Sequence, residues 1–376
     1  MSISNISPHN RFILWGKSGG RCQYRGCNKS LFVDALTKGE FNQAYIAHII
    51  ADKSKGPRGN EVLSEQLADD ISNLMLLCDA HHRLIDKIDV AGHDVNLLRQ
   101  MKREHEDRIE KVADINSDMQ SHVVIYKANV GKHSPVITFE SVKEYLLPTH
   151  YPALSDAIDL GLTNSPQRDK DDIFWQTEID NLLSQYKEQL QPKFRKSEIK
   201  HLSLFAFAPQ PLLIKLGTLI NDIHDVEIHQ PIRTPKTWRW LENEPDIKYH
   251  IQKPKKRSTV VALNISLSAD ISNDRITQIL GNDCSIHTIR IDAPFNDFLR
   301  SKKHLQDFSV AIRKLFNHTK AQYDAYTPIH VFPAMPVVTA IELGRSWMPK
   351  ADMPLIIYDE NTANSGFFKA LEIVNE

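Results

Sequence analysis

The chain has 376 residues, of which 41% are hydrophobic and 25% are charged, and its formal net charge is −1. These values are typical of a soluble globular protein with two or three domains, and they give no overall basic signature of nucleic-acid binding. The first residues are polar and lack the apolar segment of a signal peptide, and no apolar run is long enough to span a bilayer. We therefore expect a cytoplasmic protein without a membrane partner.

Three of the four cysteines lie in the first 80 residues, which favours metal binding over disulfide pairing in a reducing cytosol. Cys22 and Cys27 form a Cys-x4-Cys pair, and Cys78 and His81 form a Cys-x2-His pair. Three thiolates and one imidazole suit a tetrahedral structural Zn2+ site better than a magnesium or calcium site. The alternative is a set of buried free cysteines beside a surface histidine. We favour zinc because the two pairs occur together.

A second histidine, His82, directly follows His81. Residues 80–87 are predicted to begin a helix, and adjacent residues on a helix point about 100° apart. The two imidazoles therefore cannot easily serve one metal ion. We expect His81 to complete the zinc site and His82 to face a neighbouring groove.

Two more polar residues precede that helix. His48 lies in the apolar run YIAHII, which predicts a strand, and Asn73 lies in DISNLMLLC, five residues before Cys78. The stretches RCQYRGC, YIAHIIADKSKGPRGN and DISNLMLLCDAHHRLID resemble the zinc-stapled HNH nucleases, which have the ββα-metal fold. The resemblance covers about the first quarter of the chain, and it implies an α+β domain that hydrolyses phosphodiester bonds.

The family resemblance also implies a role for each residue. His48 would be the general base, since an imidazole has an ordinary pKa of about 6.5. Asn73 would orient that imidazole or the scissile phosphate, and His82 would hold one catalytic divalent ion, such as Mg2+. Ala47 stands where the family often has a second metal ligand, so the sequence does not identify that ligand. Asn60 is a second choice for the middle asparagine.

Each of these residues also has a purely structural explanation. A single histidine such as His48 is more often part of a core, and an asparagine such as Asn73 more often caps a helix or a turn. Their spacing relative to the cysteine pairs favours catalysis. The GPRG loop carries Lys53, Lys55 and Arg58, and both a solvated turn and contacts to phosphates stay open for it.

The chain is predicted to contain two domains joined by a linker. Apolar residues at helical spacing predict a helix near residues 94–113, which either ends a nuclease domain at residues 1–113 or serves dimerisation. Polar residues are frequent in the expected linker at 114–124. Beyond it, strand-like and helical runs alternate over 125–376, as is typical of an α/β domain with a mostly parallel sheet.

A short internal repeat indicates that the second domain is duplicated. FAFAPQPLLIKLG at 205–217 and FPAMPVVTAIELG at 332–344 share the pattern Phe-x3-Pro-x4-Ile-[Lys/Glu]-Leu-Gly. The pattern predicts two Rossmann-like halves, although two convergent strand-to-helix turns would give the same match. In such sheets ligands bind beyond the carboxyl ends of the strands, where helix N-termini offer N–H groups to phosphates. The candidate binding residues there are Pro209, Gln210, Pro333, Ala334 and Met335.

The stretches HLSLFAFAPQPLLIKLG, RTPKTWRW and HVFPAMPVVTAIELGR resemble the SAVED domain, a sensor built from two fused CARF-like halves. Together with the HNH motifs, this resemblance implies an effector of CBASS anti-phage systems that a cyclic dinucleotide, such as a cGAMP, activates. Arg233 and Lys236 would contact its phosphates, and Trp238 would stack on a base. A core tryptophan with solvated basic residues is the alternative.

We expect a metal-dependent endonuclease that degrades double-stranded DNA with low sequence specificity in abortive infection. Activation is expected to follow ligand-induced assembly into a homo-oligomer, a dimer or a tetramer, because the chain carries a single nuclease site. Two alternatives stay open. One is an HNH restriction-type nuclease that recognises modified DNA without a small molecule, and the other is a non-enzymatic, zinc-stapled DNA-binding regulator.

Overall fold

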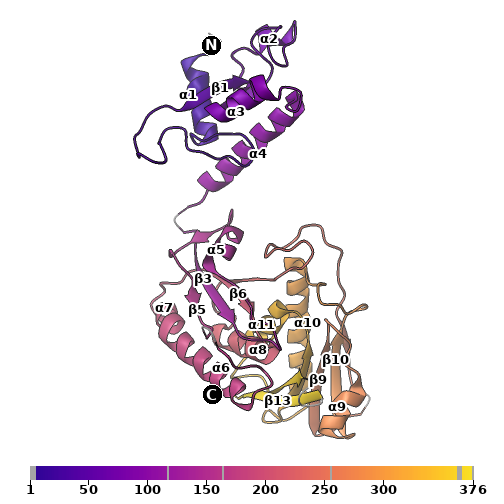
Figure 1. The fold of residues 1–376 in the computed structure, drawn as a ribbon. Coiled ribbons are helices and arrows are strands. Elements are labelled where there is room, and N and C mark those ends of the chain that lie inside the picture. Colours follow the sequence, from indigo (N-terminus) through magenta and orange to yellow (C-terminus); the bar gives the residue numbers. More distant parts are fainter. Residues whose placement is uncertain (1–5, 117, 163–164, 255, 362–365, 375–376) are drawn as a thin grey trace. The chain divides into compact units, whose positions relative to one another are not determined.

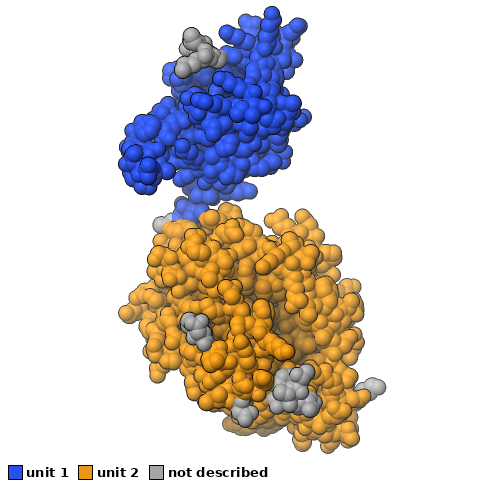
Figure 2. Space-filling view, in the orientation of Figure 1, with its two compact units in different colours: residues 1–116 blue, residues 117–376 orange. Residues whose placement is uncertain are grey.

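The computed structural model describes residues 6–116, 118–162, 165–254, 256–361 and 366–374. The chain forms two compact units, Met1–Asn116 and Ser117–Glu376, called unit 1 and unit 2 below (Figure 2). Their boundary falls in the expected linker at 114–124, but the first strand of unit 2 begins at Gln120, so the later part of that segment is a strand. Within the described residues, no helix is both long and apolar enough to cross a membrane.

Unit 1 contains a two-stranded antiparallel sheet with helices around it (Figure 1). The two strands pair so that Ala44 lies opposite Cys78 and His48 lies opposite Leu74. In chain order its elements are α1 (Pro8–Ser18), β1 (Ala44–His48), α2 (Leu63–Gln66), the 3-10 turn η1 (Ile71–Asn73), β2 (Leu74–Cys78), α3 (Asp79–Arg83), the π-helical turn η2 (Leu84–Ile88) and α4 (Val95–Ala113).

Local sequence explains the geometry of unit 1. Asp94 caps α4, since its Oδ1 accepts an N–H of the first turn at 2.7 Å. The apolar residues of β2 are fully buried, and they share one small core with Leu14 of α1 and Leu98 of α4. Strand β2 therefore ends inside the unit, at Cys78, where α3 begins.

Unit 2 contains two sheets, one in each half of the unit (Figure 1). The first sheet has the order β4-β3-β6-β7 and is parallel throughout, and β5 also pairs with β3 in parallel. The second has the order β13-β12-β11-β9-β10-β8, with parallel strands in the middle and antiparallel strands β13 and β8 at the edges. The predicted α/β fold of this part of the chain is confirmed.

All elements of the first half of unit 2 precede those of the second half along the chain. Those of the first half are β3 (Gln120–Lys127), α5 (Phe139–Val142), η3 (Lys143–Tyr145), β4 (Tyr151–Pro152), β5 (Ile158–Asp159), α6 (Asp172–Gln185), η4 (Tyr186–Leu190), α7 (Gln191–Arg195), β6 (Leu202–Phe207), α8 (Gln210–Ile220) and β7 (Val226–His229). Those of the second half are β8 (His250–Gln252), β9 (Val260–Ser266), α9 (Asn273–Leu280), β10 (Cys284–Arg290), α10 (Lys302–Lys320), β11 (Ile329–Ala334), α11 (Val337–Ser346), β12 (Leu355–Asn361) and β13 (Gly366–Ile373).

The largest hydrophobic core of unit 2 joins its two halves. It contains residues from one face of each sheet, such as Val124 of β3 and Leu263 of β9, together with residues of α6, α8, α10 and α11. The other face of the first sheet packs on the segment around α5, and the other face of the second sheet packs on α9. Helices α8 and α11 thus lie between the two sheets (Figure 1).

The two copies of the repeat pack against each other. Helices α8 and α11 cross at Gly217 and Gly344, the last residue of each copy. A Cβ on Gly217 would meet the carbonyl oxygen of Ile341, and a Cβ on Gly344 would meet that of Ile214. Because glycine has no Cβ, the two helix backbones can touch here. The repeat therefore marks equivalent places in two halves, as a duplicated unit requires.

Candidate functional site

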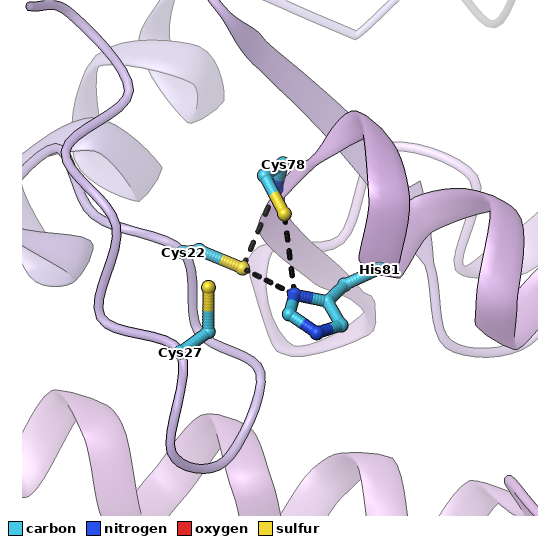
Figure 3. A group of neighbouring side chains, drawn as sticks. All are labelled: Cys22, Cys27, Cys78 and His81. Carbon is cyan, nitrogen blue, oxygen red and sulfur yellow. Dashed lines mark hydrogen bonds between the residues drawn. The ribbon is translucent and has the colours of Figure 1, made fainter. Parts of the chain in front are cut away.

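Four metal-ligating side chains meet where β2 passes into α3 (Figure 3). Nδ1 of His81 lies 3.2 Å from Sγ of Cys78 and 3.6 Å from Sγ of Cys22. With Sγ of Cys27, these ligand atoms all lie within 4.8 Å of one another. A tetrahedral zinc ion with bonds of about 2.0 to 2.3 Å needs such atoms about 3.4 to 3.8 Å apart. The predicted Cys3His set is therefore a cluster that can hold a metal ion.

The surroundings of this cluster support its geometry. The backbone N–H of Cys78 donates to Sγ of Cys22 at 3.4 Å, and the ring of His81 stacks on Tyr24 with centroids 4.1 Å apart. The hydroxyl of Tyr24 in turn lies 3.0 Å from Nε2 of His93. Burial raises the pKa of the Cys22 thiol to about 12, so a thiolate at this position requires a cation beside it.

A groove of about 640 Å³ in the same unit is lined by the two other predicted histidines, His48 and His82. Nε2 of His48 lies 2.9 Å from the carbonyl oxygen of Ala68, which can only accept a hydrogen bond. In the neutral ring Nε2 therefore carries the proton, and Nδ1 keeps a lone pair. A general base needs this protonation state.

His82 has a carboxylate partner that sequence reasoning missed. Its Nε2 lies 3.3 Å from Oδ2 of Asp86, one helical turn later, and both side chains line the groove. Burial lowers the pKa of His82, so its imidazole is neutral near pH 7 and can act as a ligand. Asp86 is thus a candidate for the second metal ligand, since Ala47 is buried and has no ligating atom.

The other oxygen of Asp86 is held by Arg58 from the GPRG loop. One guanidinium N–H of Arg58 donates to Oδ1 of Asp86 at 2.6 Å, and two others donate to backbone carbonyl oxygens at 2.7 Å. The side chain of Arg58 is only 6% exposed. Arg58 is therefore buried and holds Asp86 and two backbone carbonyl groups in place. Lys53 and Lys55, next to it in the chain, line the groove and can reach a phosphate.

The side chain of Asn73, which the sequence predicts to orient the imidazole or a phosphate, bonds to backbone groups in this structure. Its side chain is fully buried, and its Oδ1 accepts the N–H of Ile50 at 2.8 Å. Its Nδ2 donates to the carbonyl oxygens of Ile50 and Leu67, at 2.8 and 3.1 Å. Because these bonds hold the segment that carries Ala68, Asn73 is a positioning residue. The side chain of Asn60 is also engaged, since its Oδ1 accepts the N–H groups of Val62 and Leu63.

A second pocket, of about 370 Å³, lies in unit 2 at the carboxyl ends of β6 and β11, between the turns of the two repeat copies. The predicted residues that line it are Pro209, Gln210, Arg233 and Met335. It is also lined by Asp169, Asp359 and Glu360, and burial together with the charge of Asp169 raises the pKa of Asp359 to about 7. The pocket thus combines a guanidinium group with carboxyl groups that can accept hydrogen bonds.

Two glutamines join the halves of unit 2 beside this pocket. Oε1 of Gln210 accepts the N–H of Met335 at 3.1 Å, and Oε1 of Gln230 accepts the N–H of Val338 at 3.3 Å. These two N–H groups at the start of α11 are therefore paired within the protein. The sequence predicts that N–H groups at this helix start are open to phosphates, but these two N–H groups are already bonded to glutamine side chains.

Four predicted ligand-binding residues lie outside the pocket. Trp238 packs edge-on against Phe205, with ring centroids 5.4 Å apart, as the alternative of a core tryptophan requires. The carbonyl oxygen of Ala334 accepts two N–H groups from the chain after β9, at 2.9 and 2.7 Å. Pro333 is buried within β11, and Lys236 is exposed.

Comparison with known proteins assigns unit 2. The family model of the SMODS-associated and fused to various effectors sensor domain (SAVED) matches residues 182–373, just over half of the chain. The match lies within unit 2 and leaves unit 1 unassigned. No curated protein matches the chain.

Solved structures of SAVED/CARF-domain containing receptors are also similar, at low identity. The structure of Acinetobacter baumannii Cap4 with the cyclic trinucleotide 2'3'3'-cAAA is 13% identical, covers 84% of this chain and 71% of that chain, and has a TM-score of 0.43. The structure of Moraxella osloensis Cap4 is 13% identical, covers 82% and 69%, and has a TM-score of 0.36. On the family model, the chain belongs to the SAVED family of sensor domains.

Proposed function

We propose that this chain is a metal-dependent endonuclease of a CBASS anti-phage system. It degrades double-stranded DNA with low sequence specificity after unit 2 binds a cyclic oligonucleotide. The observation that carries the nuclease part is the groove of unit 1, where His48, His82 and Asp86 lie together beside two lysines. The family of unit 2 supports the sensing part.

In the groove, His48 is the general base. Its Nε2–H donates to the carbonyl oxygen of Ala68, so Nδ1 can accept a proton from the attacking water. His82 and Asp86 would hold one divalent ion, such as Mg2+, which when bound stabilises negative charge on the leaving 3′ oxygen. Arg58 keeps the carboxylate of Asp86 oriented from behind.

The other groups of unit 1 fit a DNA substrate. Lys53, Lys55 and Arg11 line the groove and would contact phosphates. Such contacts carry no sequence information, which agrees with low sequence specificity. The Cys3His cluster would hold a structural Zn2+ ion that fixes β2 and the start of α3, and hence the position of His82.

The pocket of unit 2 would take the activator, a cyclic dinucleotide or trinucleotide. Arg233 would contact a phosphate, and the carboxyl groups of Asp359 and Glu360 would accept hydrogen bonds from base amino groups. Binding is proposed to assemble several chains, as a dimer or a tetramer. Each chain contributes one His48 groove, and two such grooves are needed to cut both DNA strands at once.

Plasmid digestion in the presence of Mg2+ tests the proposal. The full chain is incubated with plasmid, with and without each member of a panel of cyclic di- and trinucleotides. Wild type is compared with His48→Ala and with His9→Ala, which changes an exposed histidine of α1 outside the groove. We expect cutting with one ligand, a loss of about 100-fold or more in His48→Ala, and no change in His9→Ala.

Other outcomes separate the alternatives. Equal cutting with and without ligand would favour the restriction-type nuclease that recognises modified DNA. Binding of DNA that never leads to cutting would favour the non-enzymatic regulator. A ligand that starts cutting while the sedimentation coefficient stays unchanged would overturn the assembly step alone.

A further inference from the structure

Three metal-ligating side chains of unit 2 converge at the amino ends of strands in the first sheet. His201 directly precedes β6, Glu227 lies in β7, and His150 directly precedes β4. One ligand atom from each of these residues lies within 4.8 Å of the others. Because the strands of this sheet are parallel, the cluster lies at the end of the sheet opposite to the proposed activator pocket.

Hydroxyl groups orient both imidazoles of this cluster. Nδ1 of His201 lies 2.9 Å from Oγ of Ser121, which also pairs with Oγ of Ser203 at 2.8 Å. Nδ1 of His150 lies 3.3 Å from Oγ1 of Thr149. Each ring therefore has Nε2 as its available ligand atom. A hydrogen bond to the far ring nitrogen is typical of histidines that bind metal ions.

The same side chains have other contacts in the structure. The rings of His150 and His201 are stacked, with centroids 3.6 Å apart and planes inclined by 10°. Oε1 of Glu227 lies 2.5 Å from Nζ of Lys302. Stacked rings do not direct their lone pairs to one point, so binding one ion requires His150 to turn. His150 is partly exposed and lies in the loop that precedes β4, and the side chain of Lys302 is 58% exposed, so both can move.

We propose that His150, His201 and Glu227 form a binding site for a divalent transition metal ion, best suited to Zn2+. Two imidazole nitrogens and one carboxylate oxygen form a zinc donor set that leaves a fourth position for water. Bonds of about 2.1 Å place the ligand atoms about 3.4 Å apart, so a turn of His150 closes the cluster around the ion. The ion replaces the ammonium group of Lys302 as the counter-charge of Glu227.

The position of this site defines what the ion does. It joins the segment before β4 to β6 and β7, and the serine that orients His201 belongs to β3, the first strand of unit 2. A bound ion thus fixes three separate segments where the chain enters the unit. Because the site has no thiolate, its metal can be distinguished from a metal in the Cys3His cluster.

Metal titration of the full chain tests the proposal. Zn2+ binding is followed by calorimetry, and Co2+ binding is followed by absorption, since only a thiolate site gives a strong charge-transfer band. Wild type is compared with His150→Ala and Glu227→Gln, and with the control His250→Ala, which removes another histidine of unit 2 from a pair with Asp292. A further variant, Lys302→Ala, removes the competing ammonium group.

We expect wild type and His250→Ala to bind one more ion than His150→Ala and Glu227→Gln. The additional Co2+ should add weak visible absorption without a charge-transfer band, and Lys302→Ala should bind this ion about tenfold more tightly. Equal numbers of bound ions in all variants, or unchanged affinity in Lys302→Ala, would overturn the proposal. Circular dichroism in the presence of Zn2+ verifies that each variant is folded. If His150→Ala is not folded, the near-isosteric Glu227→Gln decides the outcome.

Discussion

Unit 1 and unit 2 are stabilised in different ways. The core of unit 1 is small, and two of its members, Cys22 and Cys78, are also metal-ligating residues. Buried polar contacts from Arg58 and Asn73 hold its loops. In unit 2, one large apolar core joins two sheets across α8 and α11.

The two units are stabilised differently because unit 1 is much smaller than unit 2. The difference also bears on where each unit can hold a functional site. A small domain buries little apolar surface, so metal ions and buried polar contacts contribute more to its stability. In unit 1 those same contacts position the side chains of the groove. In unit 2 the pocket lies where the turns of the two halves meet, and core residues such as Leu213 and Met335 form part of its lining.

Loss of the Zn2+ ion proposed for the Cys3His cluster should give the largest difference in stability between the two units. Cys78→Ser, or a chelator, is expected to unfold unit 1 and leave unit 2 folded, because binding of structural zinc contributes about 10 kcal/mol or more. Hydrogen exchange measured by mass spectrometry should become fast in peptides of unit 1 alone. Cys284→Ser, which changes a cysteine of β10, should leave both units protected. Unfolding of both units by a chelator would contradict the view that only unit 1 depends on a metal ion for its fold.

Arg58→Ala should be the next largest change, and it should act on unit 1. Removing Arg58 leaves Oδ1 of Asp86 without its ion-pair partner and costs about 4 kcal/mol. The matched control is Arg25→Ala, whose ion pair with Glu104 is 48% exposed on both sides and should contribute less than about 1 kcal/mol. Denaturant titration of the two variants checks the prediction, and equal losses would contradict it.

Glu178 should make the stability of unit 2 depend on pH. Its side chain is buried, and within the described residues neither carboxylate oxygen has a hydrogen-bond partner. Burial raises its pKa from 4.5 to about 7. The folded state therefore holds the proton more tightly than the unfolded state. The contribution of Glu178 to the free energy of unfolding should therefore fall by about 3 kcal/mol as pH rises from 4.5 to 7.

Urea denaturation of unit 2 across this pH range tests the role of Glu178. The wild-type profile should fall by about 3 kcal/mol relative to that of Glu178→Gln, and it should run parallel to that of Glu188→Gln, which changes an exposed carboxyl group ten residues later. Asp359, whose pKa burial also raises to about 7, contributes a dependence of the same sign in all three proteins. A pH profile that is the same in wild type and Glu178→Gln would assign the dependence to another group.

A single type of substitution should have opposite effects in the two units. Gly217→Ala places a Cβ against the carbonyl oxygen of Ile341 and should destabilise unit 2 by about 2 kcal/mol. Gly16→Ala lies in α1, where the added Cβ has no atom within 4 Å apart from its chain neighbours and the backbone of its own helix. It should stabilise unit 1 by up to about 1 kcal/mol. Thermal unfolding followed separately for each unit measures both shifts. A stabilising Gly217→Ala would show that α8 and α11 do not need to touch.

The sequence predicts most elements and the metal cluster, because these depend on local patterns. The spacing of Cys22, Cys27, Cys78 and His81 was sufficient to predict that they form one cluster. Adjacent positions on a helix point in different directions, so His81 lies in the cluster and His82 lines the groove. The turns of the two repeat copies both line one pocket, as the repeat predicts. Periodicity and spacing are properties of short segments, so they can be read without knowing which distant segments will be in contact.

Contacts between distant segments could not be predicted in the same way. Arg58 is in a loop with basic neighbours, and nothing local shows that its guanidinium is buried against Asp86. Trp238 lies in a basic stretch but packs on Phe205, which is 33 residues earlier in the chain. Asp86 is an exception, because its spacing of four residues from His82 on a predicted helix was a usable signal.

We propose that unit 2 senses a ligand and unit 1 cuts DNA. The decisive measurement is the rate of plasmid cleavage as a function of ligand concentration for wild type, Arg233→Ala and His48→Ala. We predict no cutting by wild type without ligand, a curve for Arg233→Ala that is shifted to higher ligand concentration with the same plateau, and no plateau for His48→Ala. A wild-type rate that is independent of ligand, or a His48→Ala plateau equal to that of wild type, would contradict the account.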